Sequence, residues 1–262
     1  MAESIIAGIL HNQYLPEGRI YVTNKNNQER LERMGKHYDI QITTDKGAAI
    51  KDADVVILAI KPNQLHDVMD QVKGCVQSDQ LVISVIAGVP ISVIQDEFAS
   101  NVPVVRVMPN TSASIGFSAT AITAGASARE TDVQLAESVF QTIGSTVIVE
   151  ESDMHTVTGI SGSGPAYFYY LVEAMEQAAT EAGLDHKVAT DLITQTIIGA
   201  GEMLKSTGYS ANELRENIIS PGGTTQAAIE TLKVNDFQRS VKDAVESARK
   251  RSMQLGGDRE DS

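Results

Sequence analysis

The sequence predicts an α/β fold: a mostly parallel sheet flanked by helices in the first part of the chain, then an all-helical second part. Short β-branched apolar runs alternate with segments of helical periodicity up to about residue 150. Beyond the small-residue segment Ser161–Pro165, every segment has helical periodicity. With 262 residues, 42% of them hydrophobic and 21% charged, the chain is long enough for two ordinary domains.

Seven apolar runs are predicted strands of the first domain, which we expect to span residues 1–151. They are Ile20–Thr23, Ile40–Ile42, Val55–Ile60, Leu81–Ile86, Val102–Met108, Ala119–Thr123 and Ser145–Glu150. A helix is predicted around Asp132–Thr142. Because the run Asp54–Ile60 shows no alternation of polar and apolar residues, we expect both of its faces to be buried, as in a central parallel strand.

The second domain, residues 152–262, is predicted to be helical. Pro165 suits the first turn of a helix that ends at Gly183, and Asp185 caps the next helix. The first of these helices carries two apolar stripes, which about 100 residues of helical domain cannot both cover. We therefore expect an intertwined homodimer, with a higher oligomer left open. The stripes contain Phe168, Leu171, Val172 and Met175 on one side, and Tyr167, Tyr170 and Ala174 on the other.

The N-terminus departs from the usual order of such a domain. Met1–Leu10 has the pattern of a helix that leads into the strand at Ile20, whereas in a Rossmann-like, doubly wound fold a strand and a glycine turn precede this helix. Ala2 fits the last position of a GxGxxA fingerprint. Without that strand, its two neighbours would face each other unpaired at about 10 Å, forfeiting roughly ten hydrogen bonds of about 1 kcal/mol each. We expect a misplaced start or a truncated sequence; a chain that simply begins with a helix is the alternative.

Composition excludes several functions. The formal charge of −13, from 21 basic and 34 acidic residues, argues against nucleic-acid binding. A single cysteine, five scattered histidines and no CxxC or HExxH spacing give no metal signature. No apolar run approaches the roughly 18 residues of a membrane span, and no signal-peptide pattern opens the chain, so we expect a cytoplasmic protein without membrane association.

The strongest local signal is the segment Ile218–Ile229, in which a Pro-Gly-Gly turn opens a helix. Backbone N–H groups at the positive end of the helix dipole, with two threonine hydroxyls, suit a small carboxylate or phosphate. The alternative is an ordinary helix start capped by Thr224 or Thr225, and spacing alone does not separate the two.

Five motifs in order resemble the pyrroline-5-carboxylate reductase family across nearly the whole chain. Leu214, Asn217 and Ser220–Thr225 resemble the family signature, and Ser161–Tyr167 resembles its second hallmark. The other three are Ala59–Pro62, Ala87–Gly88 and Arg106–Thr111. The resemblance implies a dinucleotide-binding domain followed by a helical dimerisation domain. It also implies the last step of proline biosynthesis, hydride transfer from NAD(P)H to the C=N bond of Δ1-pyrroline-5-carboxylate to give L-proline.

The same resemblance implies site residues. The substrate carboxylate is expected at Ser220, Gly222, Gly223, Thr224 and Thr225. Thr225 is the candidate catalytic residue, through a hydrogen bond to the ring, because a protonated imine needs orientation more than a strong base. The nicotinamide side of the cofactor is expected at Ala59, Ile60, Lys61, Pro62, Val85 and Ala87, with Asn217 reaching in from the helical domain, across the dimer or within one chain.

The choice between NADPH and NADH depends on the loop after the second strand of a complete doubly wound domain, which corresponds to Ile20–Thr23 here because the first strand is missing. An acidic side chain in this loop would bind a ribose 2′-hydroxyl and repel a 2′-phosphate. This chain has Asn24, Lys25 and Asn26 there, so NADPH is favoured and NADH is the alternative; a solvated loop of the same composition is the non-functional interpretation.

Two rival functions remain open. One is a dehydrogenase of hydroxy acids, for which Lys187 and Lys205 flank the second helix without a matching motif. The other is a catalytically inactive paralogue that acts as a binding or regulatory protein. The absent glycine turn favours it and the intact Ser220–Thr225 loop opposes it, so whether this chain is active is left open. We expect His155 to be a surface or packing histidine, not a catalytic one, and Arg249–Arg251 to lie in the last turns of the C-terminal helix.

Overall fold

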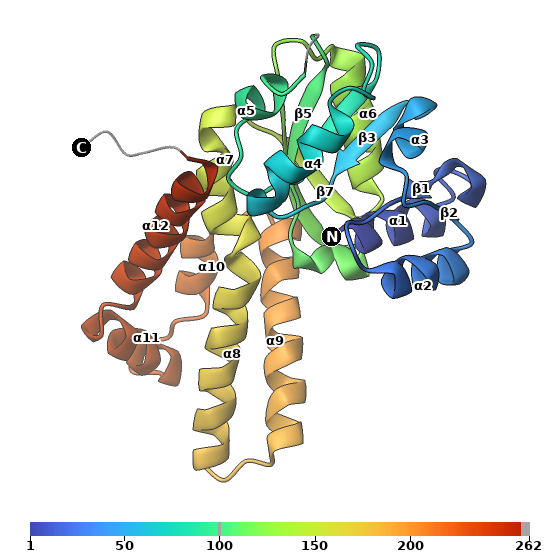
Figure 1. The fold of residues 1–262 in the computed structure, drawn as a ribbon. Helices are drawn as coiled ribbons and strands as arrows, with labels where there is room; N and C mark the ends of the chain where they lie inside the picture. Colours follow the sequence, from blue (N-terminus) through green and yellow to red (C-terminus); the bar gives the residue numbers. More distant parts are fainter. Residues whose placement is uncertain (99–100, 258–262) are drawn as a thin grey trace. The chain divides into compact units, whose positions relative to one another are not determined.

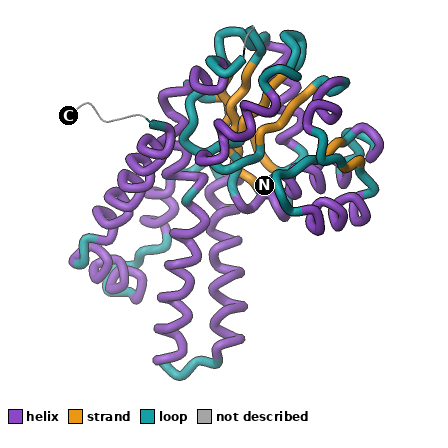
Figure 2. The backbone as a smooth tube through the Cα atoms, viewed as in Figure 1, coloured by secondary structure: helices purple, strands orange, loops and turns teal. Residues whose placement is uncertain are grey.

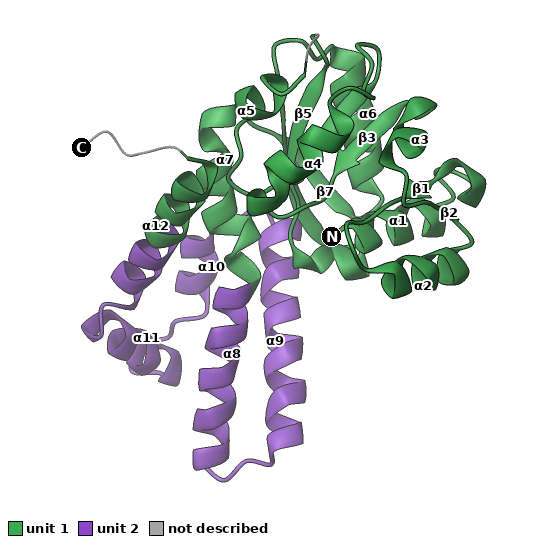
Figure 3. Ribbon diagram, in the orientation of Figure 1, with its two compact units in different colours: residues 1–165, 246–262 green, residues 166–245 purple. Residues whose placement is uncertain are grey.

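The computed structural model describes residues 1–98 and 101–257, which form two compact units (Figure 3). One unit contains residues 1–165 and 246–262, and the other contains residues 166–245. The last helix, α12 (Phe237–Gly256), contributes residues to both. The functional division expected at residues 151 and 152 stays a prediction.

All seven predicted strands are confirmed in the first unit (Figure 1). They are β1 (Tyr21–Val22), β2 (Gln41–Ile42), β3 (Val55–Leu58), β4 (Leu81–Ser84), β5 (Val104–Met108), β6 (Ser118–Ala124) and β7 (Gly144–Ile148). β1 and β2 form a parallel pair, and the other five form a sheet in the order β3-β4-β5-β6-β7. Only the β5–β6 pair in that sheet is antiparallel, so the sheet is mostly parallel, as predicted.

Helices alternate with the strands of the first unit (Figure 2), and two of these helices begin at a side-chain cap. The Asn27 side chain accepts from the Arg30 backbone N–H at the start of α2, and Asp45 accepts from the Ala48 N–H at the start of α3. The helices are α1 (Ala2–His11), α2 (Gln28–Tyr38), α3 (Lys46–Lys51), α4 (Leu65–Val72), α5 (Ile91–Gln95), α6 (Glu130–Gln141) and α7 (Met154–Val157).

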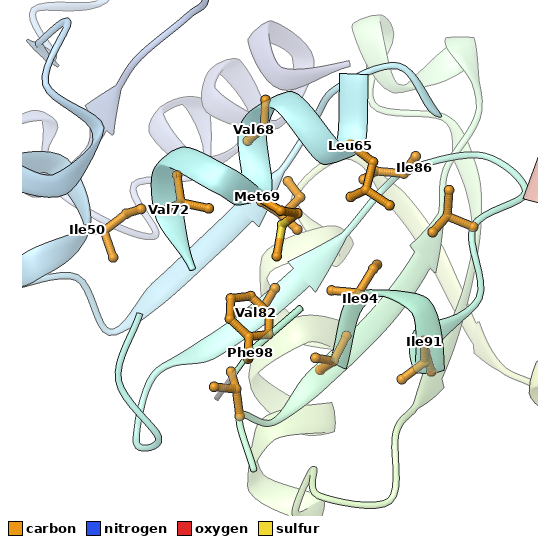
Figure 4. Close-up of a cluster of buried hydrophobic side chains, with 14 residues drawn as sticks. Ile50, Leu65, Val68, Met69, Val72, Val82, Ile86, Ile91, Ile94 and Phe98 are labelled. Carbon is orange, nitrogen blue, oxygen red and sulfur yellow. The ribbon is translucent and has the colours of Figure 1, made fainter. Parts of the chain in front are cut away.

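Two apolar clusters cover the faces of the five-stranded sheet. Val82 of β4 packs with α4 and α5 residues such as Met69 and Ile94 on one face (Figure 4). Leu81 and Ile83 pack on the other face with residues of α1 and α6. Since successive residues of a strand point to opposite faces, β4 is buried throughout, as a strand covered by helices on both sides must be.

The prediction that the Asp54–Ile60 run lies in a central strand buried on both faces is wrong for this structure. Of β3, only Leu58 is buried, while Val55, Val56 and Ile57 are half-buried. The reason is that β3 is the edge of the five-stranded sheet and pairs with β4 alone among the described strands. Among the described residues, β1 and β3 belong to separate sheets and are not paired with each other.

Charged side chains connect the two sheets instead. Arg19, just before β1, pairs with Asp54, just before β3, at 3.5 Å between Nη2 and Oδ2. Lys25, beyond the other end of β1, pairs with Asp67 of α4 at 2.6 Å between Nζ and Oδ2. The two ion pairs therefore link segments next to β1 with a segment before β3 and with α4.

The second unit consists of helices only. Asp185 caps α9, as predicted, and Ser210 and Glu213 form a capping box at the start of α10. Many large apolar side chains are exposed in this single chain, Tyr170 at 75% being an extreme case. None of the described helices is long and apolar enough to cross a membrane. The remaining helices are α8 (Gly164–Glu181), α9 (His186–Ser206), α10 (Ala211–Asn217) and α11 (Thr224–Val234).

Candidate active site

The carboxyl ends of β3 and β4 bring two of the predicted cofactor segments together. Leu58 and Ser84 are paired in register, and the Val85 backbone N–H donates to the Leu58 carbonyl at 3.1 Å. The segments that follow, 59–62 and 85–88, therefore leave the same edge of the sheet, which is where doubly wound folds bind ligands. Lys61 is exposed, while Ala59, Ile60, Pro62, Val85 and Ala87 are half-buried.

Gly88 lies in the left-handed region, with φ of +82°. A Cβ at this position would lie 2.6 Å from the Ser252 carbonyl oxygen and 3.1 Å from the Gly256 N of α12. The buried Ser252 also contacts His155, with 3.0 Å between Oγ and Nδ1. This hydrogen bond of His155 to the end of α12 was not foreseen, and its role stays a prediction. No sequence signal identifies Ser252, a serine in an otherwise basic helix end.

A charged pair anchors the segment after Gly88. Arg106 of β5 is buried, and its Nη1 donates to Glu151 Oε1 at 3.3 Å. The same Glu151 oxygen accepts from the Ile91 backbone N–H at 2.7 Å, at the first residue of α5. One carboxylate therefore fixes the start of α5 and balances a buried guanidinium.

Replacing Glu151 by glutamine is expected to lower the free energy of unfolding by about 2–3 kcal/mol. The amide keeps the size of the side chain and can still accept from Ile91, but Arg106 loses the Glu151 carboxylate. Urea unfolding of the variant against Glu150→Gln, a neighbouring exposed carboxylate, measures the difference. Equal midpoints for the two variants would contradict this role of Glu151.

Two of the three predicted cofactor residues in the loop after β1 have partners within the protein. Asn24 Nδ2 donates to the Asn27 carbonyl at 2.7 Å, and Asn24 Oδ1 accepts from the Asn27 N–H at 3.1 Å. Lys25 binds Asp67, as described above, and Asn26 is exposed. The Thr23 hydroxyl is buried without a hydrogen-bond partner among the described residues. Sequence reasoning missed Asp67, because it lies 42 residues from Lys25 in the chain.

The Ser220–Thr225 segment forms a tight turn ahead of α11 in the second unit. The Gly223 N–H donates to the Ser220 carbonyl at 2.9 Å, and the Gly222 N–H donates to Gln226 Oε1 at 2.8 Å. The N-cap of α11 is Gly223, and no side chain caps it. The alternative of a helix capped by Thr224 or Thr225 is therefore wrong, because both residues lie inside the first turn.

That turn presents donors to an anion. Without a capping side chain, the first backbone N–H groups of α11 remain available at the positive end of its dipole. The Gly222 φ of +71° explains why glycine stands at that position. Asn217, the predicted cofactor contact from this unit, is the exposed last residue of α10. Roles for these residues stay predictions.

Comparison with known proteins decides the family. Residues 151–255 match the family model described as pyrroline-5-carboxylate reductase dimerisation, and residues 1–88 match the model described as NADP oxidoreductase coenzyme F420-dependent. Pyrroline-5-carboxylate reductase 1 of Bacillus spizizenii is 42% identical over 258 residues, which are 98% of this chain and 87% of that protein. The chain belongs to the pyrroline-5-carboxylate reductase family.

Solved structures of pyrroline-5-carboxylate reductases share the whole fold. The enzyme of Coxiella burnetii is similar with a TM-score of 0.88 and 33% identity, over 97% of this chain and 94% of that chain. The Plasmodium falciparum enzyme, solved with NADP bound, is similar with a TM-score of 0.86 and 27% identity, over 97% and 93% of the two chains. The fold class predicted from the sequence, a Rossmann-like domain followed by a helical domain, is thereby confirmed.

Proposed function

We propose that this protein reduces Δ1-pyrroline-5-carboxylate to L-proline with NADPH, as the last step of proline biosynthesis. The observation that carries the proposal is the Pro-Gly-Gly turn ahead of α11, whose helix start is left without a side-chain cap in a member of this family. The substrate is a small ring with one carboxylate. Donors in a fixed turn suit that group without a large positive surface, consistent with a chain charge of −13.

The residues present fit NADPH at both of its ends. Lys25 is a cation at the end of β1, where a 2′-phosphate would bind, and residues 23–27 contain no carboxylate. At the other end, 59–62 and 85–88 frame the nicotinamide side. Between them α1 begins with no side-chain cap, so its first N–H groups suit a pyrophosphate. When bound, NADPH supplies the hydride.

The chain's own residues bind and orient the substrate. The Ser220–Thr225 turn holds the carboxylate, with the Thr224 and Thr225 N–H groups as its backbone donors, because the Gly222 and Gly223 N–H groups already donate to Gln226 Oε1 and the Ser220 carbonyl. The Thr225 hydroxyl donates a hydrogen bond toward the ring. Because a protonated imine is already electrophilic, orientation of its carbon accounts for most of the catalysis. Asn217 contributes to cofactor binding from the helical unit.

Thr225→Ala is expected to lower kcat/KM for pyrroline-5-carboxylate by roughly 10- to 100-fold, the effect of losing one hydrogen bond to a charged group. Thr225→Ser keeps the hydroxyl and is expected to stay within a few-fold of the parent. The matched control is Thr231→Ala on the same helix, whose hydroxyl donates to the Ala227 carbonyl. A Thr225→Ala variant as active as the Thr231→Ala variant would remove Thr225 from the site.

The protein acts as a homodimer in this proposal, and a higher oligomer remains open. The exposed apolar side chains of α8 and α9, among them Tyr170 and Leu192, need a cover that one chain does not supply. A cytoplasmic location, with no membrane or nucleic-acid partner, completes the proposal. Sedimentation equilibrium gives the mass of the assembly.

The test of the function is oxidation of NADPH by pyrroline-5-carboxylate, followed through the loss of NADPH absorbance. The chain is assayed beside a version extended before Met1 by an apolar strand ending in a Gly-x-Gly turn. Turnover by either version, with L-proline as product, supports the proposal. Absence of turnover by both, while both are folded dimers that bind NADPH, would favour the binding or regulatory paralogue, which no comparison favours at present.

A further inference from the structure

The cation expected to hold a 2′-phosphate already has a partner of opposite charge. Lys25 Nζ and Asp67 Oδ2 lie 2.6 Å apart, a charge-assisted hydrogen bond as well as an ion pair. Lys25 comes from the loop after β1, and Asp67 from the first turn of α4, the helix that follows β3. Both residues belong to the first unit, and both follow the carboxyl ends of parallel strands, β1 and β3.

This ion pair is weak enough to exchange partners. The Lys25 side chain is 45% exposed and that of Asp67 is 60% exposed, so water screens their attraction. Pairs of this kind contribute little to stability. A phosphate monoester near neutral pH carries up to two negative charges and three acceptor oxygens, so it competes well with one carboxylate for the same ammonium group.

The Asp67 carboxylate lies beside the loop in which an acid distinguishes NADH from NADPH in other doubly wound enzymes. Doubly wound enzymes that use NADH place an acidic side chain at the end of the second strand, where it accepts a hydrogen bond from the ribose 2′-hydroxyl. Residues 23–27 supply no such acid, but the structure holds the Asp67 carboxylate against Lys25 in that loop. The carboxylate beside this loop therefore belongs to α4, and not to the end of the strand.

We propose that Asp67 sets the selectivity between NADPH and NADH. This rests on the proposed function, since it assumes that the loop after β1 binds the adenosine ribose. With NADH, the Lys25–Asp67 pair stays closed and its carboxylate faces the 2′-hydroxyl. With NADPH, Lys25 must leave Asp67 for the 2′-phosphate, and the nearby carboxylate repels that phosphate. Asp67 thus lowers NADPH affinity and allows use of both cofactors.

The test measures cofactor binding, which does not depend on turnover. NADPH and NADH are titrated separately into the full chain by fluorescence, for the parent, Asp67→Asn, Lys25→Gln and the double variant. Asp70→Asn is the matched control, because it removes the same charge from the next turn of α4, where Asp70 pairs with Lys73 at 2.8 Å and not with Lys25. Asp67→Asn is expected to lower the Kd for NADPH about two- to fivefold and leave NADH unchanged or weaker. Asp70→Asn is expected to change neither.

The double variant separates an effect through Lys25 from a general effect of charge. Lys25→Gln is expected to weaken NADPH about tenfold, as loss of a charge-assisted hydrogen bond does. In the Lys25→Gln background, Asp67→Asn is expected to raise NADPH affinity by less than half of the factor by which it raises NADPH affinity in the parent. An equal gain in both backgrounds, or equal changes for NADPH and NADH, would overturn the role of the pair.

Two further readouts separate this inference from the proposed function. Raised salt is expected to weaken binding of NADPH more than binding of NADH in the parent, because the contact between Lys25 and the 2′-phosphate is ionic. If the parent binds both cofactors but does not reduce pyrroline-5-carboxylate, the proposed function fails while the binding ratio still decides the role of Asp67. If the parent binds neither cofactor, both proposals fall.

Discussion

Adding an apolar strand of about five residues and a Gly-x-Gly turn directly before Met1 is expected to raise the free energy of unfolding by about 2–5 kcal/mol. The added strand would pair with β1 on one side and β3 on the other, which have no hydrogen bonds to each other in the described structure. It would also cover Val55, Val56 and Ile57, which are only half-buried. Ordering of the added residues offsets part of the gain, which is why the net value is modest.

Urea unfolding and amide hydrogen exchange measure this effect. Exchange at β3 is expected to slow in the extended chain, because its outer edge gains partners. The matched control is an extension of equal length in which the apolar residues are replaced by alternating Asp and Lys, which neither face of the sheet would bury. The same unfolding midpoint for both extensions would show that the β1 and β3 edges do not accept a strand.

Gly88→Ala is expected to lower kcat/KM with NADPH by about 10- to 100-fold, since small displacements of positioning groups cost this much. The added Cβ would meet the Ser252 carbonyl at 2.6 Å, and residue 88 would also have to keep φ at +82°. Backbone atoms of a helix cannot yield as a flexible side chain does. Either the 85–88 segment or the end of α12 must therefore move.

Gly116→Ala is the control that separates the two costs. Gly116 has a similar φ of +78°, but a Cβ there would have no neighbour within 4 Å. Both variants carry the cost of alanine in the left-handed region, about 1 kcal/mol, and only Gly88→Ala carries the clash. We expect Gly116→Ala to keep its activity. Equal losses of activity in the two variants would show that conformation alone, and not packing against α12, matters at Gly88.

The strands could be predicted because each one depends on a short local pattern. β4 begins with three apolar residues, Leu81–Ile83, and β6 and β7 are bounded by the turn signals around Gly125 and Gly144. Helix starts at Asp185 and Pro165 follow equally local rules. The prediction that β3 is a central strand was wrong for a different reason. An apolar pattern shows that a strand packs against other residues, but it does not show how many strands pair with it.

Site residues could be predicted only where a motif carries them. The Ser220–Thr225 turn is visible as Pro-Gly-Gly, but whether a threonine caps the helix depended on the path of the backbone, which makes Gly223 the cap. Lys25 was visible as a cation in a loop, and its partner was not. Glu151 gave no signal, because its partner Arg106 lies 45 residues away on another element.

By itself the sequence determined the family and the order of strands and helices, since these follow from motifs and from periods of two or 3.6 residues. The segments expected to hold a cofactor and a small carboxylate stay predictions. The tertiary structure alone decided that β3 is an edge strand, that Ser252 lies against Gly88 and that Asp67 holds Lys25. These facts depend on pairings between residues far apart in the sequence, such as Lys25 and Asp67, which are 42 positions apart. Local patterns do not encode such pairings; packing of the whole chain does.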